Sequence, residues 1–382
     1  MISMIATHKD PIRILHVVGG MNYGGVETWL MNLLRQIDRD RFHIDFLVHT
    51  AQPCPYDDEI RRLGSQVIPC LSPSQPLQYA RNFRRILHSR APYHVIHSHV
   101  HHYSGYILFL AQKLNIPVRI AHSHNDTSMA QLHAGYWRRS YLKLMSYWID
   151  QHATIGLAAS HKAAVALFGN DYENHPRWQI LYCGVDLRCF QEHVDAHTVR
   201  AEFNIPSDAF VLGHVGRFTE QKNHSFLLEL VAEVVRRNPK TYLILLGEGP
   251  LRTLIEQKVH QLGLSKHVIF AGIRSDIPRI MLGAMDIFIL PSLYEGLPLV
   301  GIEAQAAGVP LLISDVITDE LDYVKPLVKR MSLTQPASTW AEAALEICQS
   351  PILDIDHRSL LEQSRFNIIN GLKALEKIYA YQ

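Results

Sequence analysis

The sequence predicts an α/β protein made of two doubly wound domains, each with a parallel sheet that helices cover on both faces. A chain of 382 residues with 47% hydrophobic content is long enough for two domains of ordinary size. Short apolar segments rich in β-branched residues alternate with helical patterns along the whole chain. This alternation weakens in the polar stretch 187–208 and then starts again. The predicted domains are therefore residues 11–187 and residues 188–363.

The first domain begins with a predicted strand at 12–18, a glycine-rich loop and a helix from about 26 to 37. Gly24 and Gly25 in this loop would let the backbone come close to a ligand, although their spacing is not that of a dinucleotide site and a plain tight turn remains the alternative. Further strands are expected at 44–48, 67–69, 95–98, 118–122, 153–159 and 178–182, with helices at 57–63, 77–89, 103–114 and 135–149.

Histidines gather where two of these strands end. They are His97, His99, His101 and His102 after one strand, and His122 and His124 after another. A metal is one interpretation, but nothing has the spacing of a closed zinc site, and 23 histidines in the chain make chance clusters common. Ligands of such sheets collect at the carboxyl ends of strands, so we favour a polar lining. His124 and then His122 are the candidates for substrate contact, and a purely structural role remains open.

The predicted helix 135–149 is basic, aromatic and amphipathic. An aromatic and apolar stripe at helical spacing is interleaved with cations: Trp137, Tyr141, Leu144 and Trp148, with Arg138, Arg139 and Lys143. We favour packing of this stripe against the sheet, which is the commoner outcome. Contact with a bilayer surface is the alternative.

The second domain repeats the pattern. Strands are expected at 210–215, 242–246, 268–271, 286–290 and 311–313, with helices at 224–237, 251–262, 276–283 and 298–307. Arg217 and Lys222 lie in the loop after the first of these strands, where two cations would neutralise a diphosphate. A solvated surface pair is the alternative.

The loop and helix of residues 291–307 have the features of a receptor for a sugar joined to a phosphate. Gly296, Leu297 and Leu299 offer backbone amides at the positive end of a helix, where a phosphate binds. Glu295 precedes these amides and Glu303 follows them, and both carboxylates accept hydrogen bonds from hydroxyls.

Composition excludes several classes of protein. Lys plus Arg number 37 against 36 for Asp plus Glu, so no global charge points to nucleic acid. Five cysteines without a C-x-x-C pair are typical of reduced thiols in a cytoplasmic protein. No apolar run is long enough to span a membrane, and the first ten residues are not a signal peptide. We expect a cytoplasmic location, with the inner face of the membrane as the alternative.

Three sets of residues together resemble the retaining GT-B glycosyltransferases of family 4. They are Gly24-Gly25-x-Glu27, Gly216-Arg217 with Lys222-Asn223, and Glu295-x7-Glu303. The EpsF-like branch, which acts in polysaccharide synthesis, is the most similar through R-I-A-H-S-H-N at 119–125 and I-S-D-x-I-T-D-E at 313–320. The resemblance covers nearly the whole chain, in the right order.

This resemblance implies a GT-B fold, in which two Rossmann-like domains face each other across a cleft. Residues 11–187 would bind the acceptor and residues 188–363 the nucleotide-sugar donor, most simply a UDP- or GDP-sugar. A C-terminal helix, 364–382, would pack back on the first domain. The expected buried face of that helix is Phe366, Ile369, Leu372, Leu375, Ile378 and Tyr379.

The resemblance also implies roles for single residues. Arg217 and Lys222 would hold the diphosphate with the helix amides, Glu295 the sugar hydroxyls and Glu303 the ribose. The expected catalytic residues are Arg217, Lys222, Glu295 and His124. The expected donor-binding residues also include Gly24, Gly25, Gly272, Arg274, Gly296, Leu297, Leu299 and Glu303. The expected acceptor side consists of His99, His122 and His124.

The implied reaction moves a sugar, with retention, to a glycan or a lipid-linked acceptor in cell-surface or exopolysaccharide synthesis. No carboxylate is placed as the nucleophile of a retaining hydrolase. Catalysis would rest on leaving-group stabilisation and positioning, with no cofactor and no metal. The alternatives are another GT-B enzyme, such as a nucleotide-sugar epimerase or a glycoside phosphorylase, and a non-catalytic homologue that binds sugar nucleotides.

Overall fold

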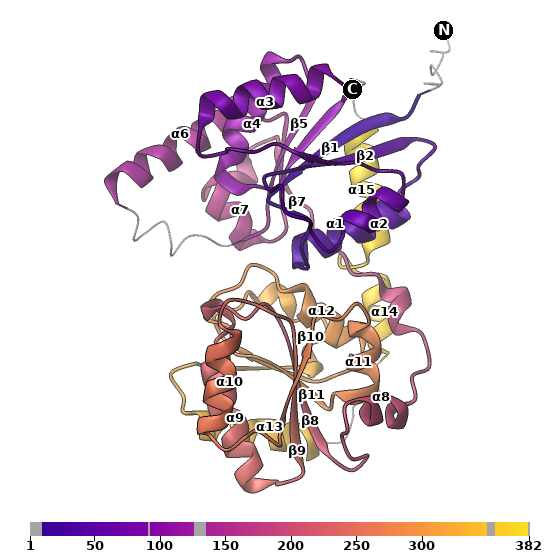
Figure 1. The fold of residues 1–382 in the computed structure, drawn as a ribbon, viewed down its shortest axis with the longest axis vertical. Coiled ribbons are helices and arrows are strands. Elements are labelled where there is room, and N and C mark those ends of the chain that lie inside the picture. The colour runs from indigo at the N-terminus through magenta and orange to yellow at the C-terminus, as the bar shows by residue number, and fades with distance from the viewer. Residues whose placement is uncertain (1–9, 91, 126–134, 350–355, 381–382) are drawn as a thin grey trace. The chain divides into compact units, whose positions relative to one another are not determined.

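The computed structural model describes residues 10–90, 92–125, 135–349 and 356–380 (Figure 1). The chain forms two compact units. Unit 1 consists of Met1–Cys183 together with Ile369–Gln382, and unit 2 of Gly184–Ile368. Each unit is built around one parallel sheet, so the predicted pair of doubly wound domains is confirmed.

Unit 1 has a seven-stranded sheet in the order β3-β2-β1-β4-β5-β6-β7. Its strands are β1 (Ile12–Val18), β2 (Phe42–Val48), β3 (Val67–Pro69), β4 (Val95–Ser98), β5 (Val118–Ser123), β6 (Ile155–Ala158) and β7 (Trp178–Ile180). Successive strands are added outward from β1 on one side and outward from β4 on the other. The order therefore reverses between β1 and β4, which is where sheets of this kind open for ligands.

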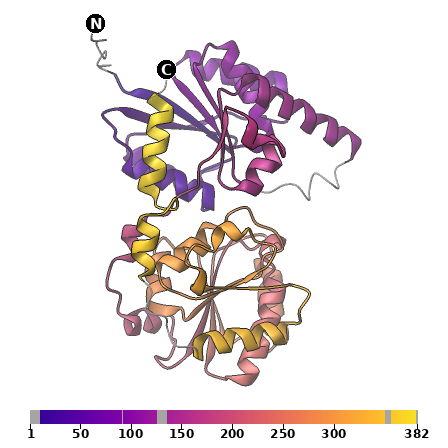
Figure 2. The same ribbon diagram turned by 180° about the vertical axis from the view of Figure 1, so that it is seen from behind.

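Helices cover both faces of this sheet. They are α1 (Gly25–Gln36), α2 (Asp57–Arg62), α3 (Pro76–His88), α4 (Ser104–Lys113), α6 (Tyr136–His152), α7 (His161–Phe168) and α15 (Ile368–Ala380). The apolar core under α3, α4, α6 and α7 includes Val17, Ile96 and Ala121 of the sheet. The opposite face carries His16 and His97, which lie against Tyr379 of α15. Figure 2 shows this helix, in yellow, running along the first unit. The last helix of the chain thus completes the first unit.

The buried face predicted for the C-terminal helix needs one correction. Leu372, Leu375 and Tyr379 are buried as expected, but Ile369 is exposed. The helix begins at Ile368, so Ile368 starts the row that continues at positions 372, 375 and 379, and Ile369 lies about 100° away around the axis. Phe366 is buried but precedes the helix.

Unit 2 has a six-stranded sheet in the order β10-β9-β8-β11-β12-β13. Its strands are β8 (Phe210–Val215), β9 (Thr241–Leu246), β10 (Val268–Gly272), β11 (Ile287–Leu290), β12 (Leu311–Ser314) and β13 (Val328–Met331). Its helices are α8 (Ala196–Glu202), α9 (His224–Arg237), α10 (Arg252–Gln261), α11 (Ile277–Ala284), α12 (Leu299–Ala306), α13 (Ala337–Gln349) and α14 (His357–Glu362). Every residue of β11 is fully buried, as expected for a central parallel strand with helices on both faces.

Within the described residues, no helix is long and apolar enough to cross a membrane.

Candidate functional site

The carboxyl edge of the unit 2 sheet brings two predicted loops together. β8 and β11 pair directly, Ile287 with Leu212 and Phe288 with Gly213, although the paired residues are 75 positions apart in sequence. The loop that follows each strand therefore leaves the sheet at the same edge. The backbone amide of Leu293 donates to the carbonyl of Gln221 at 2.8 Å, which fastens one loop to the other.

Lys222 and Glu295 meet where these loops join. Lys222 Nζ lies 2.6 Å from Glu295 Oε1, and both side chains are largely buried. Ser292 Oγ donates to the same carboxylate oxygen at 2.8 Å, and Gln221 Nε2 donates to Oε2 at 3.1 Å. Glu295 is thus held by three donors, one of which, Lys222, also neutralises its charge. Gln221 and Ser292 were not predicted from the sequence, although Ser292 lies two residues after a buried strand and three residues before the predicted carboxylate.

Gly216 makes room for the lysine. A Cβ atom at this position would lie 3.0 Å from Lys222 Cε and 3.1 Å from Cδ, closer than side chains normally pack. The lysine stem therefore crosses directly over the backbone of the loop. This close approach is the local reason for a glycine immediately before Arg217.

Arg217 is the exposed cation of this edge. Its guanidinium makes no hydrogen bond or ion pair with any residue that the structure describes. Unlike Lys222, it is not committed to a carboxylate and remains available to an anion. A planar guanidinium suits bidentate binding of a phosphate.

The start of α12 supplies unbonded amides. Pro298 occupies the position just before the helix, one residue earlier than predicted, and α12 begins at Leu299. The amides of Gly296, Leu297 and Leu299 donate to no acceptor in the described ranges. Such amides at the positive end of a helix form an anion site when a cation stands near them.

Glu303 lies on α12 without a hydrogen-bonding partner or cation among the described residues. Burial raises the pKa of its carboxyl to about 7. The side chain retains some exposure. An acid in this state gains most from a ligand that donates hydroxyl hydrogen bonds, because these stabilise the ionised form.

The predicted loop at 272–274 lies two strands away from β8, beyond β9. Gly272 has a positive φ of 65° at the end of β10, and its carbonyl accepts from the amide of Gly247 at 2.8 Å. Arg274 donates to both carboxylate oxygens of Asp276 at 2.7 Å. Its charge is therefore already compensated, in contrast to Arg217.

In unit 1, Gly24 caps the start of α1 and Gly25 is its first residue. A Cβ atom at Gly24 would collide with the carboxylate of Glu27, whereas Gly25 has open space on that side. The side chain of Glu27 is thus folded over the turn. The part predicted for these glycines in donor binding stays a prediction.

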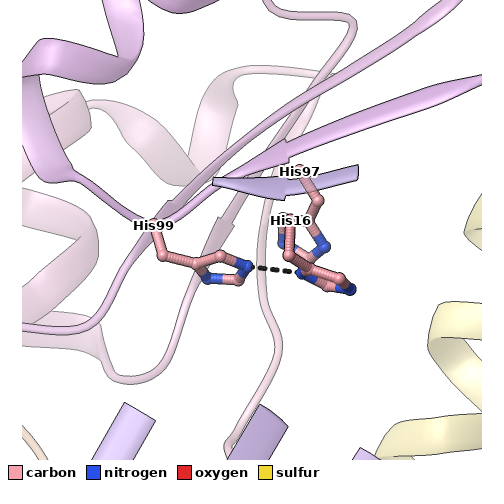
Figure 3. Close-up of side chains that lie close together, drawn as sticks. All are labelled: His16, His97 and His99. Carbon is pink, nitrogen blue, oxygen red and sulfur yellow. Dashed lines mark hydrogen bonds between the residues drawn. The ribbon is translucent and has the colours of Figure 1, made fainter. Parts of the chain in front are cut away.

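The predicted histidines converge on one face of the unit 1 sheet. They are joined by His16 of β1, which was not predicted to belong to a site (Figure 3). Five imidazoles lie in ring contact with their neighbours: His16, His97, His99, His122 and His124. Burial lowers the pKa of each ring, to about 3 for His16 and His124, so the rings are neutral. His101 and His102 pair with each other instead.

The preference for core packing of helix α6 was wrong for most of its stripe. Trp137 is 85% exposed, and Tyr141 and Leu144 are also exposed. Of the predicted stripe, Trp148 packs inward, where it stacks on Phe109 of α4. The buried positions are Met145 and Ile149, which set a contact line on α4 that leaves the first half of the stripe in solvent.

Comparisons with known proteins agree with this architecture. Residues 23–188 match the family model "Glycosyltransferase Family 4", and residues 195–363 match "Glycosyl transferases group 1". The chain is 39% identical over 334 residues to a putative glycosyltransferase EpsF of Bacillus subtilis (strain 168), with 86% of each chain covered. It is 22% identical over 387 residues to a UDP-Gal:α-D-GlcNAc-diphosphoundecaprenol α-1,3-galactosyltransferase of Escherichia coli, covering 98% of this chain and 96% of the relative.

Solved structures share the fold. Anabaena Alr3699/HepE in complex with UDP and glucose superposes with a TM-score of 0.78 at 18% identity, covering 97% of this chain and 100% of that chain. WaaG, a glycosyltransferase involved in lipopolysaccharide biosynthesis, gives a TM-score of 0.72 at 16% identity, with 97% and 100% covered. With two parallel sheets of seven and six strands, two matching family models and a 39% identical relative, the chain belongs to glycosyltransferase family 4 and has the GT-B fold.

Proposed function

We propose that this glycosyltransferase moves a sugar from a nucleotide-sugar to a glycan or lipid-linked acceptor in polysaccharide synthesis, with retention at the anomeric carbon. The observation that carries the proposal is the edge of unit 2, where the buried Lys222–Glu295 pair adjoins the loop of the uncommitted Arg217. Names of relatives support the pathway: one is a capsular polysaccharide glycosyltransferase of Staphylococcus aureus, and another acts on a diphosphoundecaprenol-linked sugar.

In this proposal, unit 2 binds the donor. Arg217 and Lys222 hold the diphosphate together with the amides of Gly296, Leu297 and Leu299, because both kinds of group are donors directed at an anion. Glu303 accepts hydrogen bonds from the ribose, and Gly272 and Arg274 border the base. A UDP-sugar is the first candidate and a GDP-sugar the second, since Anabaena HepE was crystallised with UDP and UDP-glucose.

Glu295 serves recognition rather than nucleophilic attack. Three donors, one of them the Lys222 cation, already engage its carboxylate. The chemistry is then leaving-group stabilisation, in which fixed cations and amides bind the diphosphate more strongly as the glycosidic bond breaks. We propose that this step needs no divalent cation, and expect Mg²⁺ or Mn²⁺ to leave the rate unchanged.

Unit 1 binds the acceptor at the carboxyl edge of its sheet. His99 retains some exposure and His124 a little, whereas His122 is fully covered. We therefore place His99 and His124 nearest the acceptor and His122 behind them. His124 would orient the acceptor hydroxyl as a neutral imidazole, since burial keeps its pKa far below neutrality.

Helix α6 supplies a surface for peripheral membrane contact. It carries three exposed cations, Arg138, Arg139 and Lys143, against a single acid, Asp150. Exposed aromatic side chains accompany these cations: Tyr136, Trp137, Tyr141 and Tyr147. Aromatic rings and cations on one short helix suit the headgroup region of an anionic bilayer, where a lipid-linked acceptor is found.

The test is incubation of the purified protein with UDP- and GDP-sugars and a diphosphate-linked lipid acceptor, followed by mass spectrometry and NMR of the new linkage. We expect a glycosylated acceptor with the donor's anomeric configuration and free nucleoside diphosphate. An epimerised nucleotide-sugar as the main product would indicate an epimerase instead of a transferase. A sugar 1-phosphate as the main product would indicate a phosphorylase. A melting-point rise with nucleotide-sugars but no turnover on any acceptor would favour a non-catalytic role.

A further inference from the structure

The histidine cluster of unit 1 is built by three neighbouring strands. β4 lies between β1 and β5, and the register places His16 opposite His97, and His97 opposite Ile120, two residues before His122. Side chains two residues apart on a strand share a face, so both H-x-H pairs point to the same side as His16. Figure 3 shows three of these rings close together.

The rings form two hydrogen-bonded rows. In the first, His16 Nδ1 lies 2.8 Å from His99 Nε2, His99 Nδ1 lies 2.8 Å from His124 Nε2, and His124 Nδ1 lies 3.5 Å from Cys183 Sγ. In the second, Tyr379 Oη lies 2.8 Å from His97 Nδ1, and His97 Nε2 lies 3.1 Å from His122 Nδ1.

Each row leaves a buried nitrogen without a hydrogen bond among the described residues. These nitrogens are Nε2 of His16 and Nε2 of His122. A backbone group of Leu181 lies near enough to favour the protonated His122 ring, but it makes no hydrogen bond of normal geometry to Nε2. Leaving such an atom unpaired costs about 1–3 kcal/mol, so a ligand for it would stabilise the unit.

Two groups of three histidines bring ligand nitrogens within 4.8 Å of one another: His16, His97 and His99, and His99, His122 and His124. In each group two rings have both nitrogens engaged and the third has a free Nε2, which belongs to His16 in the first group and to His122 in the second. The groups differ in exposure, because His16 and His97 are fully covered, whereas His99 and His124 retain some exposure. We propose that His99, His122 and His124 bind a divalent transition metal ion, with Zn²⁺ as the reference case.

The surrounding hydrogen bonds fit this assignment. If the metal takes Nδ1 of His99 and Nε2 of His122 and His124, each ring keeps its single N–H on the outer nitrogen. Those nitrogens face His16 Nδ1, His97 Nε2 and Cys183 Sγ. Ligating histidines normally donate their second N–H in this way, and the partners fix the tautomer. Metal binding breaks the hydrogen bond between His99 Nδ1 and His124 Nε2, and the proton of that bond moves to a nitrogen that does not bind the metal. Binding therefore needs a change of tautomer but no net loss of a proton.

The chemistry of the donor set indicates the class of ion. Three neutral imidazoles suit zinc, copper and nickel, whereas magnesium and calcium require oxygen ligands that the three rings lack. Such an ion would join the carboxyl ends of β4 and β5. The inference goes beyond the proposed function, because it assigns an ion to rings that the proposed function places on the acceptor side, whereas the diphosphate groups belong to unit 2.

The test uses tag-free full-length protein, because other histidines bind metals weakly. After incubation with excess Zn²⁺ and gel filtration, we expect about one zinc per chain. With Co²⁺ we expect the intense visible absorption of a four-coordinate site. Copper-loaded wild type should show coupling to several imidazole nitrogens by pulsed EPR, a measurement that needs no variant. Less than a tenth of an equivalent of zinc, together with no cobalt band, would refute the site.

Three variants locate the ion. His122→Gln should weaken cobalt binding at least 100-fold and abolish the zinc-dependent rise in melting temperature. His16 belongs to the other group of three histidines, so His16→Gln should weaken cobalt binding less than 10-fold. His260→Gln, on the exposed side of α10, is the matched control and should change nothing. A full cobalt spectrum in His122→Gln, or its loss in His16→Gln alone, would contradict the assignment.

Discussion

Lys222 Nζ and Glu295 Oε1 lie 2.6 Å apart, although the two residues are far apart in sequence. The lysine follows β8 and the glutamate follows β11, and only the pairing of those two strands brings them together. The pair joins the groups that we propose to bind the phosphate to the group that we propose to bind the sugar.

Lys222→Met should lower both stability and activity. It leaves the Glu295 carboxylate buried without its cation, which costs about 3–5 kcal/mol of unfolding free energy. Loss of a donor to the leaving group should lower kcat about 10²–10³-fold. Urea unfolding and steady-state kinetics measure the two effects. The double variant Lys222→Met/Glu295→Gln removes both charges, so it should recover stability without activity; no recovery would contradict a charge-pair origin.

Arg217→Ala should lower activity without lowering stability. The side chain is exposed and uncommitted, so its loss should change the unfolding free energy by less than about 0.5 kcal/mol. Activity should fall about 10²–10³-fold, with weaker binding of UDP by calorimetry. Arg236→Ala, an exposed arginine of α9, is the matched control. Wild-type activity in Arg217→Ala would show that the phosphate binds elsewhere.

Glu303 should make stability depend on pH near neutrality. Burial raises the pKa of its carboxyl from 4.5 to about 7 in the folded protein. The folded state therefore favours the protonated acid, and its contribution is fully present below about pH 4.5 and lost as the pH rises toward 7. Partial exposure limits this contribution to about 2 kcal/mol. As the pH rises from 4.5 to 8, the unfolding free energy of the wild type should fall relative to that of Glu303→Gln. Parallel curves of unfolding free energy against pH would contradict the raised pKa of Glu303.

Helix α6 should direct the protein to anionic vesicles. Replacing Arg138, Arg139 and Lys143 by serine removes about 1 kcal/mol of attraction per cation, so binding in flotation assays should fall more than 100-fold. Trp137→Ser should weaken vesicle binding less than the triple variant does. This loss should not depend on the salt concentration, because the indole contributes apolar contact and no charge. Replacing Arg236, Arg237 and Lys240 in unit 2 by serine removes the same three charges and is the control for net charge. Equal flotation of the triple variant and the wild type would exclude α6 as the contact.

The sequence predicted the fold well where patterns are local and strong. Continuous apolar runs such as 287–290 become central strands because both faces are covered. It missed β13, whose Lys329 and Arg330 interrupt any apolar run, and the helices α7, α8, α13 and α14. β13 is the edge strand of its sheet, and its pairing with β12 defines it.

The candidate site was predictable only in part. Arg217, Lys222, Glu295 and Glu303 were found because their residue types follow strand ends or lie on a predicted helix. Ser292 was not predicted, because a serine by itself does not indicate a site. Its role follows from the hydrogen bond that it donates to the Glu295 carboxylate. The stripe of α6 was misread for a related reason. Periodicity gives the width of an apolar face, but whether a neighbouring helix covers that face depends on where α4 begins, since Gly105 at its start lies against Met145.

The position of α15 has a consequence for synthesis on the ribosome. Residues 369–380 belong to unit 1, where Leu375 and Tyr379 are buried, yet they are translated after all of unit 2. Domains generally fold in the order in which they emerge. Here the part of the first sheet that α15 covers, around His16, Phe42 and His97, stays without this helix until α15 leaves the exit tunnel. We therefore expect the second domain to reach its final form before the first, and nascent chains to need protection over that face of β1 and β2 in the interval.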